Sequence, residues 1–317
     1  MRPRRGFELP PDMEPLARRT IRIEWWTLFF LSTIVVVMYA TMGNSQAMKA
    51  AWLEDVLSMI PPVAILLAAR YRDRRPTAHF PYGYHRAVSI AFLVAALALL
   101  TMGSYMLYDS IGKLVAMEHP SIGLIPFFGR EIWLGWLMIA ALSYSAIAPV
   151  ILGRMKIPLA HQLHDKALYA DADMNKADWL TAVAGIFGIL GIGIGWWWAD
   201  GVAAGIISLD VVRDGFKNTR RVIADLMDSR PTTVETAEPD EVVERLETWF
   251  LGFDWVVDAR ARLREEGHVF TGEVFVIPRP GTDDLVEKMA DAVRKAPAVD
   301  WRLWEIVVMP VTGFEPE

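Results

Sequence analysis

Residues 164–179, HDKALYADADMNKADW, carry several acidic side chains directly into one of the most apolar runs of the sequence. A helix places residues spaced i, i+3, i+4 and i+7 on one face. The residues with this spacing are Asp171, Met174, Asn175 and Asp178. The stretch therefore predicts a membrane helix with a polar stripe along one side.

A second acidic pair, Glu54 and Asp55, lies inside the apolar run at 50–69, AAWLEDVLSMIPPVAILLAA. An acidic residue at the centre of a membrane helix costs about 2.5 to 3.5 kcal/mol on insertion scales, so such residues face each other or a wet cavity. A purely structural ion pair, with Lys49 or with a basic residue on a neighbouring helix, is the alternative. We expect the two acidic segments to bind a cation together.

The composition indicates a chain that is part membrane and part soluble. Hydrophobic residues make up 53% of its 317 residues, and the mean hydropathy is +0.26, which is too apolar for an ordinary soluble protein. The net charge of −6 reflects an acidic tail after Asp225, whereas Arg and Lys fringe the apolar part, so we expect no nucleic-acid partner. Because cysteine is absent, the possible metal ligands are carboxylate, imidazole, amide and thioether groups.

Apolar runs of roughly 20 residues cross about 30 Å of hydrocarbon, and six can be placed, at 25–43, 50–70, 87–109, 132–152, 172–195 and 199–216. With six spans, the segments rich in Arg and Lys all fall on one side, which the positive-inside rule makes the cytoplasm. We therefore expect a multi-pass protein of the lipid bilayer, in a plasma or inner membrane, with both termini cytoplasmic. The predicted parts are a cytoplasmic N-terminal segment (1–24), a six-helix transmembrane domain (25–216), a linker (217–234) and a cytoplasmic α+β domain (235–317).

The last two spans are separated at Gly195–Asp200, although GIFGILGIGIGWWWADGVAAGIISL could also form one long helix. The tryptophans at 196–198 are typical of an interfacial belt. Asp200 is expected to cap the helix that follows it. Glycines at 185, 188, 191 and 193 would let neighbouring helices approach closely.

After Pro231 the composition becomes that of a soluble domain. PDEVVERLETWF and TDDLVEKMADAVRKA have the features of helices. DWVVDARARLRE and HVFTGEVFVIPR alternate like half-buried strands separated by a turn at Glu266-Gly267, and WRLWEIVVMPV closes with a strand. The order α-β-β-α-β predicts a small α+β, ferredoxin-like domain with its helices on one face of a three-stranded sheet.

The six spans, the basic loop FPYGYHR (80–86), the acidic residues and the α-β-β-α-β tail together resemble the cation diffusion facilitator family of metal transporters. PYGYHR looks like the family's HPYGYxR loop, YADADMNKADWLTA (169–182) like its ADxxHxxSD segment, and WADGVAA (198–204) like the start of its sixth span. The resemblance covers about residues 25–311. It implies a homodimeric antiporter, and not an enzyme, that exchanges a divalent metal ion for protons and moves the metal out of the cytoplasm. No permanently bound cofactor is expected.

The chain departs from the family at its ligand positions. In the second span the paired ligands of the family fall on Glu54 and Ser58. In the fifth span they fall on Met174 and Asp178, so the family's imidazole is absent. Further candidates to complete the shell are Asp55, Asp171, Asp173 and Asn175.

This ligand set leaves the metal open among manganese, iron, cobalt and zinc. Carboxylate, amide and hydroxyl groups suit harder ions such as Mn²⁺, Mg²⁺ or Fe²⁺ better than zinc, whereas Met174 favours a softer ion. The tail lacks the histidines that metal-binding members of the family place in its strands, and His268 stands alone there. We expect the tail to serve as a dimerisation element and not as a metal sensor.

Carboxyl groups in a low-dielectric site favour the protonated form, and a bound divalent cation favours the ionised form. Competition between metal and protons for the same ligands would therefore give antiport. Pro61 and Pro62 lack backbone donors, so we expect a kink in the second span just after the acidic pair.

Other interpretations stay open from the sequence. Asp171 and Asp173 could be a solvated helix start that the macrodipole favours, and Met174 could be a packing residue. His161 and His164 lie on a basic loop, where they could collect metal or be ordinary loop histidines. The competing function is a non-transporting membrane partner or metal sensor that kept the transporter scaffold.

Overall fold

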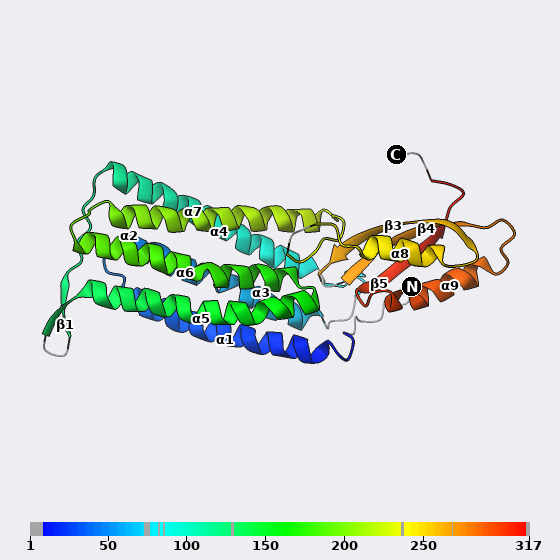
Figure 1. Cartoon of the computed structure of the whole chain (residues 1–317), viewed down its shortest axis with the longest axis horizontal. Helices are drawn as coiled ribbons and strands as arrows, with labels where there is room; N and C mark the ends of the chain where they lie inside the picture. The colour runs from blue at the N-terminus through cyan, green and yellow to red at the C-terminus, as the bar shows by residue number, and fades with distance from the viewer. Residues whose placement is uncertain are drawn as a thin grey trace.

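The computed structural model describes residues 9–72, 77–81, 83–84, 86–127, 130–235, 238–267 and 269–314. It shows an elongated helical bundle with a small sheet domain at one end (Figure 1). The bundle helices are α1 (Glu14–Thr41), α2 (Gln46–Leu57), α3 (Ile60–Arg72), α4 (Arg86–Val115), α5 (Leu134–Leu163), α6 (Lys166–Gly193) and α7 (Ala199–Leu226). Tyr82 and His85 of the FPYGYHR loop, and His268, lie outside the described residues.

Within the described residues, five helical segments are long and apolar enough to cross a membrane. They are α1, the α2–α3 segment over Gln46–Leu67, α4 from Phe92 onward, α5 and α6. The remaining helix, α7, carries charged residues at 210, 213 and 214, yet it packs against α2, α4 and α6 inside the bundle. A helical membrane region followed by a sheet domain agrees with the predicted architecture.

The second apolar run is interrupted where the prolines predicted a distortion. α2 ends at Leu57, α3 begins at Ile60, and Pro61 and Pro62 occupy the first turn of α3. Proline has no N–H to donate, so the carbonyl groups of Leu57 and Ser58 lose the donors that a continuous helix would supply from four residues further on. The predicted kink is confirmed as a break in the helix.

Several helices continue past the predicted spans at the end of the bundle that carries the sheet domain. α1 begins at Glu14, α5 continues to Leu163 and α6 already begins at Lys166. The predicted membrane spans ended where charged side chains begin in the sequence. In the structure, some of these side chains pair with one another inside the bundle, so they do not end the helices.

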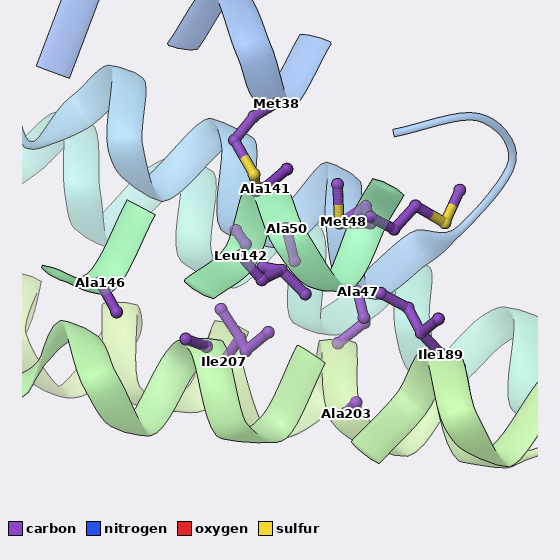
Figure 2. Packing of buried hydrophobic residues seen from close by; sticks show 14 of the residues in the cluster. Met38, Ala47, Met48, Ala50, Ala141, Leu142, Ala146, Ile189, Ala203 and Ile207 are labelled. Carbon is purple, nitrogen blue, oxygen red and sulfur yellow. The ribbon is translucent and has the colours of Figure 1, made fainter. Parts of the chain in front are cut away.

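Small residues and methionines fill the centre of the bundle (Figure 2). Ala47 and Ala50 of α2 meet Ala141 of α5, while Ala203 of α7 packs in the same cluster. The predicted close approach at a glycine is confirmed at Gly191, because a Cβ atom built there would lie 2.2 Å from the Cβ atom of Ala199. Helices α6 and α7 can therefore lie together only without a side chain at this position.

Asp200 caps a different helix from the one that the sequence predicted. It is fully buried in the first turn of α7, and its carboxylate accepts hydrogen bonds from Ser45 Oγ at 2.6 Å, from the amide of Gln46 at 2.5 Å and from the amide of Ala47 at 3.2 Å. Those amides are free donors at the start of α2. The prediction that Asp200 caps its own helix is wrong, because the nearby start of α2 offers it three donors.

A short hairpin, which the sequence analysis did not predict, joins α4 to α5. It consists of β1 (Leu124–Phe127) and β2 (Arg130–Trp133), which pair in antiparallel fashion. The hairpin lies at the end of the bundle that faces away from the sheet domain (Figure 1).

The sheet domain follows the predicted order α-β-β-α-β. Its elements are α8 (Val242–Leu251), β3 (Val256–Glu266), β4 (Val269–Pro278), α9 (Leu285–Lys295), the short 3₁₀ helix η1 (Ala296–Ala298) and β5 (Leu303–Pro310). β3 pairs antiparallel with β4, and β4 pairs parallel with β5. The turn between β3 and β4 contains Gly267, as predicted, with a φ of +67°. Both helices share one hydrophobic core with the sheet.

A buried polar contact joins the bundle to the sheet domain. His164 ends α5 in a left-handed conformation (φ 50°), and its Nδ1 accepts a hydrogen bond from Arg302 Nη1 at 2.7 Å. Arg302 also donates to Asp240 at 2.8 Å, and the ring of Phe270 packs edge-on against the imidazole. Burial, followed by the charge of Arg302, lowers the pKa of His164 to about 3. The interpretation of His164 as an ordinary loop histidine is therefore wrong.

Candidate metal-ion site

Glu54 lies on the side of α2 that faces α6. Thr181 Oγ1 of α6 donates to Glu54 Oε1 at 3.3 Å. The other carboxylate oxygen, Oε2, is buried and has no hydrogen-bond partner. Glu54 therefore offers a free oxygen in the interior of the bundle, where a carboxylate normally has a cation or a full set of donors.

Asp55 follows on the next position of α2 and is also buried. Its Oδ2 has no hydrogen-bond partner, and the charge acting on it is that of Glu54. Within the described part of the chain, neither carboxylate forms an ion pair with Lys49. An ion pair with Lys49 therefore does not explain why Glu54 and Asp55 are present inside the apolar run.

Asp178 lies in the middle of α6, across from α2. The charges that act on its carboxylate come first from Glu54 and then from Asp55. Thr181, which holds Glu54, is three residues further along the same helix and shares its face. The structure thus brings together the acidic segments of α2 and α6, as the sequence predicted.

Helix α7 adds further negative charge to the same region. The charges of Asp210 and Asp214 both act on Glu54. The sequence did not decide the role of Asp210, and the structure places it on the helix that packs against α2 and α6. Three helices therefore contribute carboxylates around Glu54, which makes the interior attractive to cations.

Asp171 is held in a different contact from the one predicted. It is buried and forms an ion pair with Lys156 of α5, whose Nζ also donates to Glu24 Oε2 of α1 at 2.9 Å. The interpretation of Asp171 as a solvated helix start is wrong, because burial and a cation partner replace water. Asp173 is different: it is partly exposed and lies 3.7 Å from Lys217.

The remaining predicted ligands, Ser58, Met174 and Asn175, offer fewer atoms that are free to bind an ion. Ser58 caps the end of α2 and is buried. Met174 packs against the cluster of Leu57 and Leu99, and its sulfur accepts a weak contact from Asn218 Nδ2 at 3.7 Å. Asn175 is buried on the α6 face that carries Asp171 and Asp178. Met174 thus has the contacts of a packing residue.

The predicted ligands do not form one assembled site, because Asp171 pairs with Lys156 and Asp173 lies near Lys217. No group of three or more His, Asp or Glu side chains in the described ranges lies close enough together to hold a metal ion. The charges of Glu54 and Asp55 on α2 act on Asp178 of the facing helix α6.

Residues missed by the sequence analysis complete this picture. Thr181 could have been found from its i+3 spacing to Asp178. Glu24 and Lys156 were assigned to segments outside the spans, since the predicted limits were 25 and 152, although both are fully buried in the bundle. Glu24 and Lys156 pair with each other across two helices, and the spacing of residues along one helix does not show such a pair.

Comparison with known proteins identifies the class of protein. Residues 26–227 match the model of the cation efflux transmembrane domain. The chain therefore belongs to the cation diffusion facilitator family, as a divergent member, and it is an integral membrane transporter of divalent metal cations and not an enzyme.

Individual relatives are distant but extend over most of the chain. The manganese efflux system protein MneS of Bacillus subtilis is 24% identical over 259 residues, which cover 78% of this chain and 85% of that protein. MneP, a second manganese efflux system protein of Bacillus subtilis, is 25% identical over 73% of this chain and 74% of its own length. A cadmium, cobalt and zinc/H⁺-K⁺ antiporter of Bacillus velezensis is 24% identical over 62% of this chain and 58% of its own length.

Proposed function

We propose that this protein exports a manganese-like divalent cation from the cytoplasm in exchange for protons, through a site formed by Glu54, Asp55 and Asp178. The observation that carries the proposal is the pair of buried, unpartnered carboxylate oxygens of Glu54 and Asp55 opposite Asp178. Unpaired acids inside a membrane bundle are expensive, and a bound cation would compensate them.

The chemistry of the available ligands favours a hard ion. The oxygens come from carboxylates, from Ser58 and from the carbonyl groups of Leu57 and Ser58 that the prolines leave without donors. Oxygen ligands suit Mn²⁺ and Mg²⁺, whereas zinc sites commonly use nitrogen and sulfur. Two of the relatives are named manganese efflux proteins, which supports Mn²⁺ as the first ion to test.

Proton coupling would follow from the same carboxylates. Without metal, a low-dielectric interior favours their neutral form, and a divalent cation favours the ionised form. Metal binding on one side of the membrane would therefore release protons, and protonation on the other side would release metal. The break between α2 and α3 beside Glu54 gives the helix a place to move during this exchange.

We also propose that all six helical segments of the bundle span the membrane, with α7 as the sixth. Asp210 and Asp214 of α7 act on Glu54 and would face the candidate site rather than lipid, whereas Arg213 is exposed. α1 begins at the end of the bundle where the sheet domain lies (Figure 1), as an even number of spans requires. The positive-inside rule then gives cytoplasmic termini in a plasma or inner membrane.

The tail is proposed to be a ferredoxin-like dimerisation domain. Apolar side chains on its strands remain exposed in the single chain, namely Val257, Val307 and Met309. Exposed apolar groups on a small domain indicate a contact surface. A homodimer would cover them, and size-exclusion chromatography with light scattering would measure its mass.

Proteoliposomes with a pH-sensitive dye inside test the transport proposal. We expect Mn²⁺-dependent proton movement in the unaltered protein and its loss in Asp178→Asn, which removes a charge and keeps the shape. Asp109→Asn, at an ion pair with Lys113, is the matched control and should keep transport. If the folded protein transports none of Mn²⁺, Fe²⁺, Co²⁺, Zn²⁺ and Cd²⁺, the proposal of transport is wrong. The protein would then be a non-transporting membrane partner or a metal sensor.

A further inference from the structure

A second buried charge cluster lies beside the candidate site, formed by Glu24 of α1, Lys156 of α5 and Asp171 of α6. Lys156 Nζ forms ion pairs with both carboxylates, at 2.9 Å to Glu24 Oε2 and at closer range to Asp171. Glu24 and Lys156 are 0% exposed and Asp171 is 2% exposed. With all three ionised, two negative charges share one positive charge.

The cluster leaves one polar atom without a partner. Glu24 Oε1 is buried and accepts no hydrogen bond. A structural ion pair is stabilising only when its oxygens are fully satisfied, and Glu24 Oε1 is an oxygen that a bound cation would satisfy.

The cluster lies nearer the sheet-domain end of the bundle than Asp178 does. α6 begins at the end of the bundle that carries the sheet domain, and Asp171 precedes Asp178 by seven residues, or about 10 Å along the helix. The Asp178 carboxylate is affected by the charges of both Asp171 and Lys156. A cation entering from the sheet-domain end would therefore meet Glu24 and Asp171 before it reached Asp178.

We propose that Glu24 and Asp171 form a second binding position for the transported divalent cation and that the Lys156 ammonium occupies it as a tethered competitor. The incoming ion displaces the ammonium, which the flexible stem of lysine permits. Moving the positive charge away from Asp178 also favours arrival of a divalent ion there. This inference rests on the proposed function because it concerns the same transported ion.

Counting the bound ions tests the proposal without measuring transport. The probe is Mn²⁺, added to the purified full chain in detergent, with bound metal measured after equilibrium dialysis. At Mn²⁺ concentrations at which the ammonium still occupies the position in the unaltered chain, we expect Lys156→Met to bind one more Mn²⁺ per chain, because the competitor is removed. The extra ion should disappear in Lys156→Met/Glu24→Gln, whereas Lys113→Met, at a different ion pair, should bind the same number of ions as the unaltered chain. Folded Lys156→Met without an extra ion would overturn the proposal.

A second variant decides the matter if Lys156→Met does not fold. Asp171→Asn keeps the shape and leaves Lys156 paired one-to-one with Glu24. The proposal predicts a KM for Mn²⁺ transport raised about tenfold, equivalent to about 1.4 kcal/mol, with an unchanged maximal rate. A purely structural cluster predicts lower thermal stability with an unchanged KM, and that result would overturn the proposal. Absence of any Mn²⁺ binding or transport by the unaltered protein would instead contradict the proposed function itself.

Discussion

Acidification should weaken the joint between the bundle and the sheet domain through His164. In the folded chain its Nδ1 accepts from Arg302, so the ring is neutral and a second proton would point at a guanidinium. Burial and the Arg302 charge lower its pKa from 6.5 to about 3. Between these values the folded chain binds fewer protons here than the unfolded chain, so stability is fully present above pH 6.5 and falls as the pH falls.

The size of the effect follows from that shift. At pH 5 the unfolded imidazole is mostly protonated and the folded one is not, which costs the folded state about 2 kcal/mol relative to neutral pH. Thermal unfolding of the purified protein should be followed from pH 7.5 to 5 for the unaltered chain and for His164→Gln, whose amide oxygen can still accept from Arg302. Other groups titrate equally in both proteins, so their difference isolates His164.

We expect His164→Gln to lose less stability than the unaltered protein on acidification, by about 2 kcal/mol at pH 5. Equal losses in the two proteins would refute the reasoning, because they would show that the ring is not held neutral by the joint.

Three further predictions concern the fold. Asp200→Ala should destabilise the protein by about 2 to 4 kcal/mol in chemical unfolding, because it leaves three buried donors at the start of α2 unpaired. Asp200→Asn should destabilise the protein less. Equal, negligible losses of stability in the two variants would argue against the cap. Gly191→Ala should lower the thermal midpoint, since a Cβ atom there overlaps α7, whereas Gly205→Ala, with nothing within 4 Å of its Cβ atom, should not. Burial raises the pKa of Glu265 to about 7 even beside Lys166, so the stability of the folded chain falls as the pH rises from 4.5 to 7. Between pH 5 and 8 the stability of Glu265→Gln should therefore rise by about 2 kcal/mol relative to that of the unaltered chain. Parallel pH profiles of stability for the two proteins would contradict this.

Features that repeat along one element were predictable from the sequence. The apolar runs, the break at Pro61, the turn at Gly267 and the order of helices and strands in the tail all depend on neighbours in the chain. The meeting of Glu54 and Asp178 was also predicted, because acids inside two apolar runs have few other stable arrangements. The resemblance to the cation diffusion facilitator family was recognisable as well, because its motifs are short stretches of sequence.

Features that depend on contact between distant segments were not predictable. The sequence predicts Asp200 as the cap of the helix that follows it. In the folded chain Asp200 caps α2 instead, because the start of α2 lies next to it. Lys156 and Glu24 read as charged ends of membrane spans, although each is the partner of the other across the bundle. His164 reads as a loop residue because the sequence does not show that Arg302, 138 positions later, packs on it. In each case a charge marks a contact whose partner is remote in the sequence.

Binding of Mn²⁺ to Glu54 tests the central claim most directly. Mn²⁺ is paramagnetic, so electron paramagnetic resonance of the purified protein counts free and bound ions in one titration. We predict Mn²⁺ binding by the unaltered chain that is lost in Glu54→Gln and retained in Asp109→Asn, with both variants folded. Equal binding by Glu54→Gln and the unaltered chain would contradict the assignment of the α2–α6 carboxylates as the ion site.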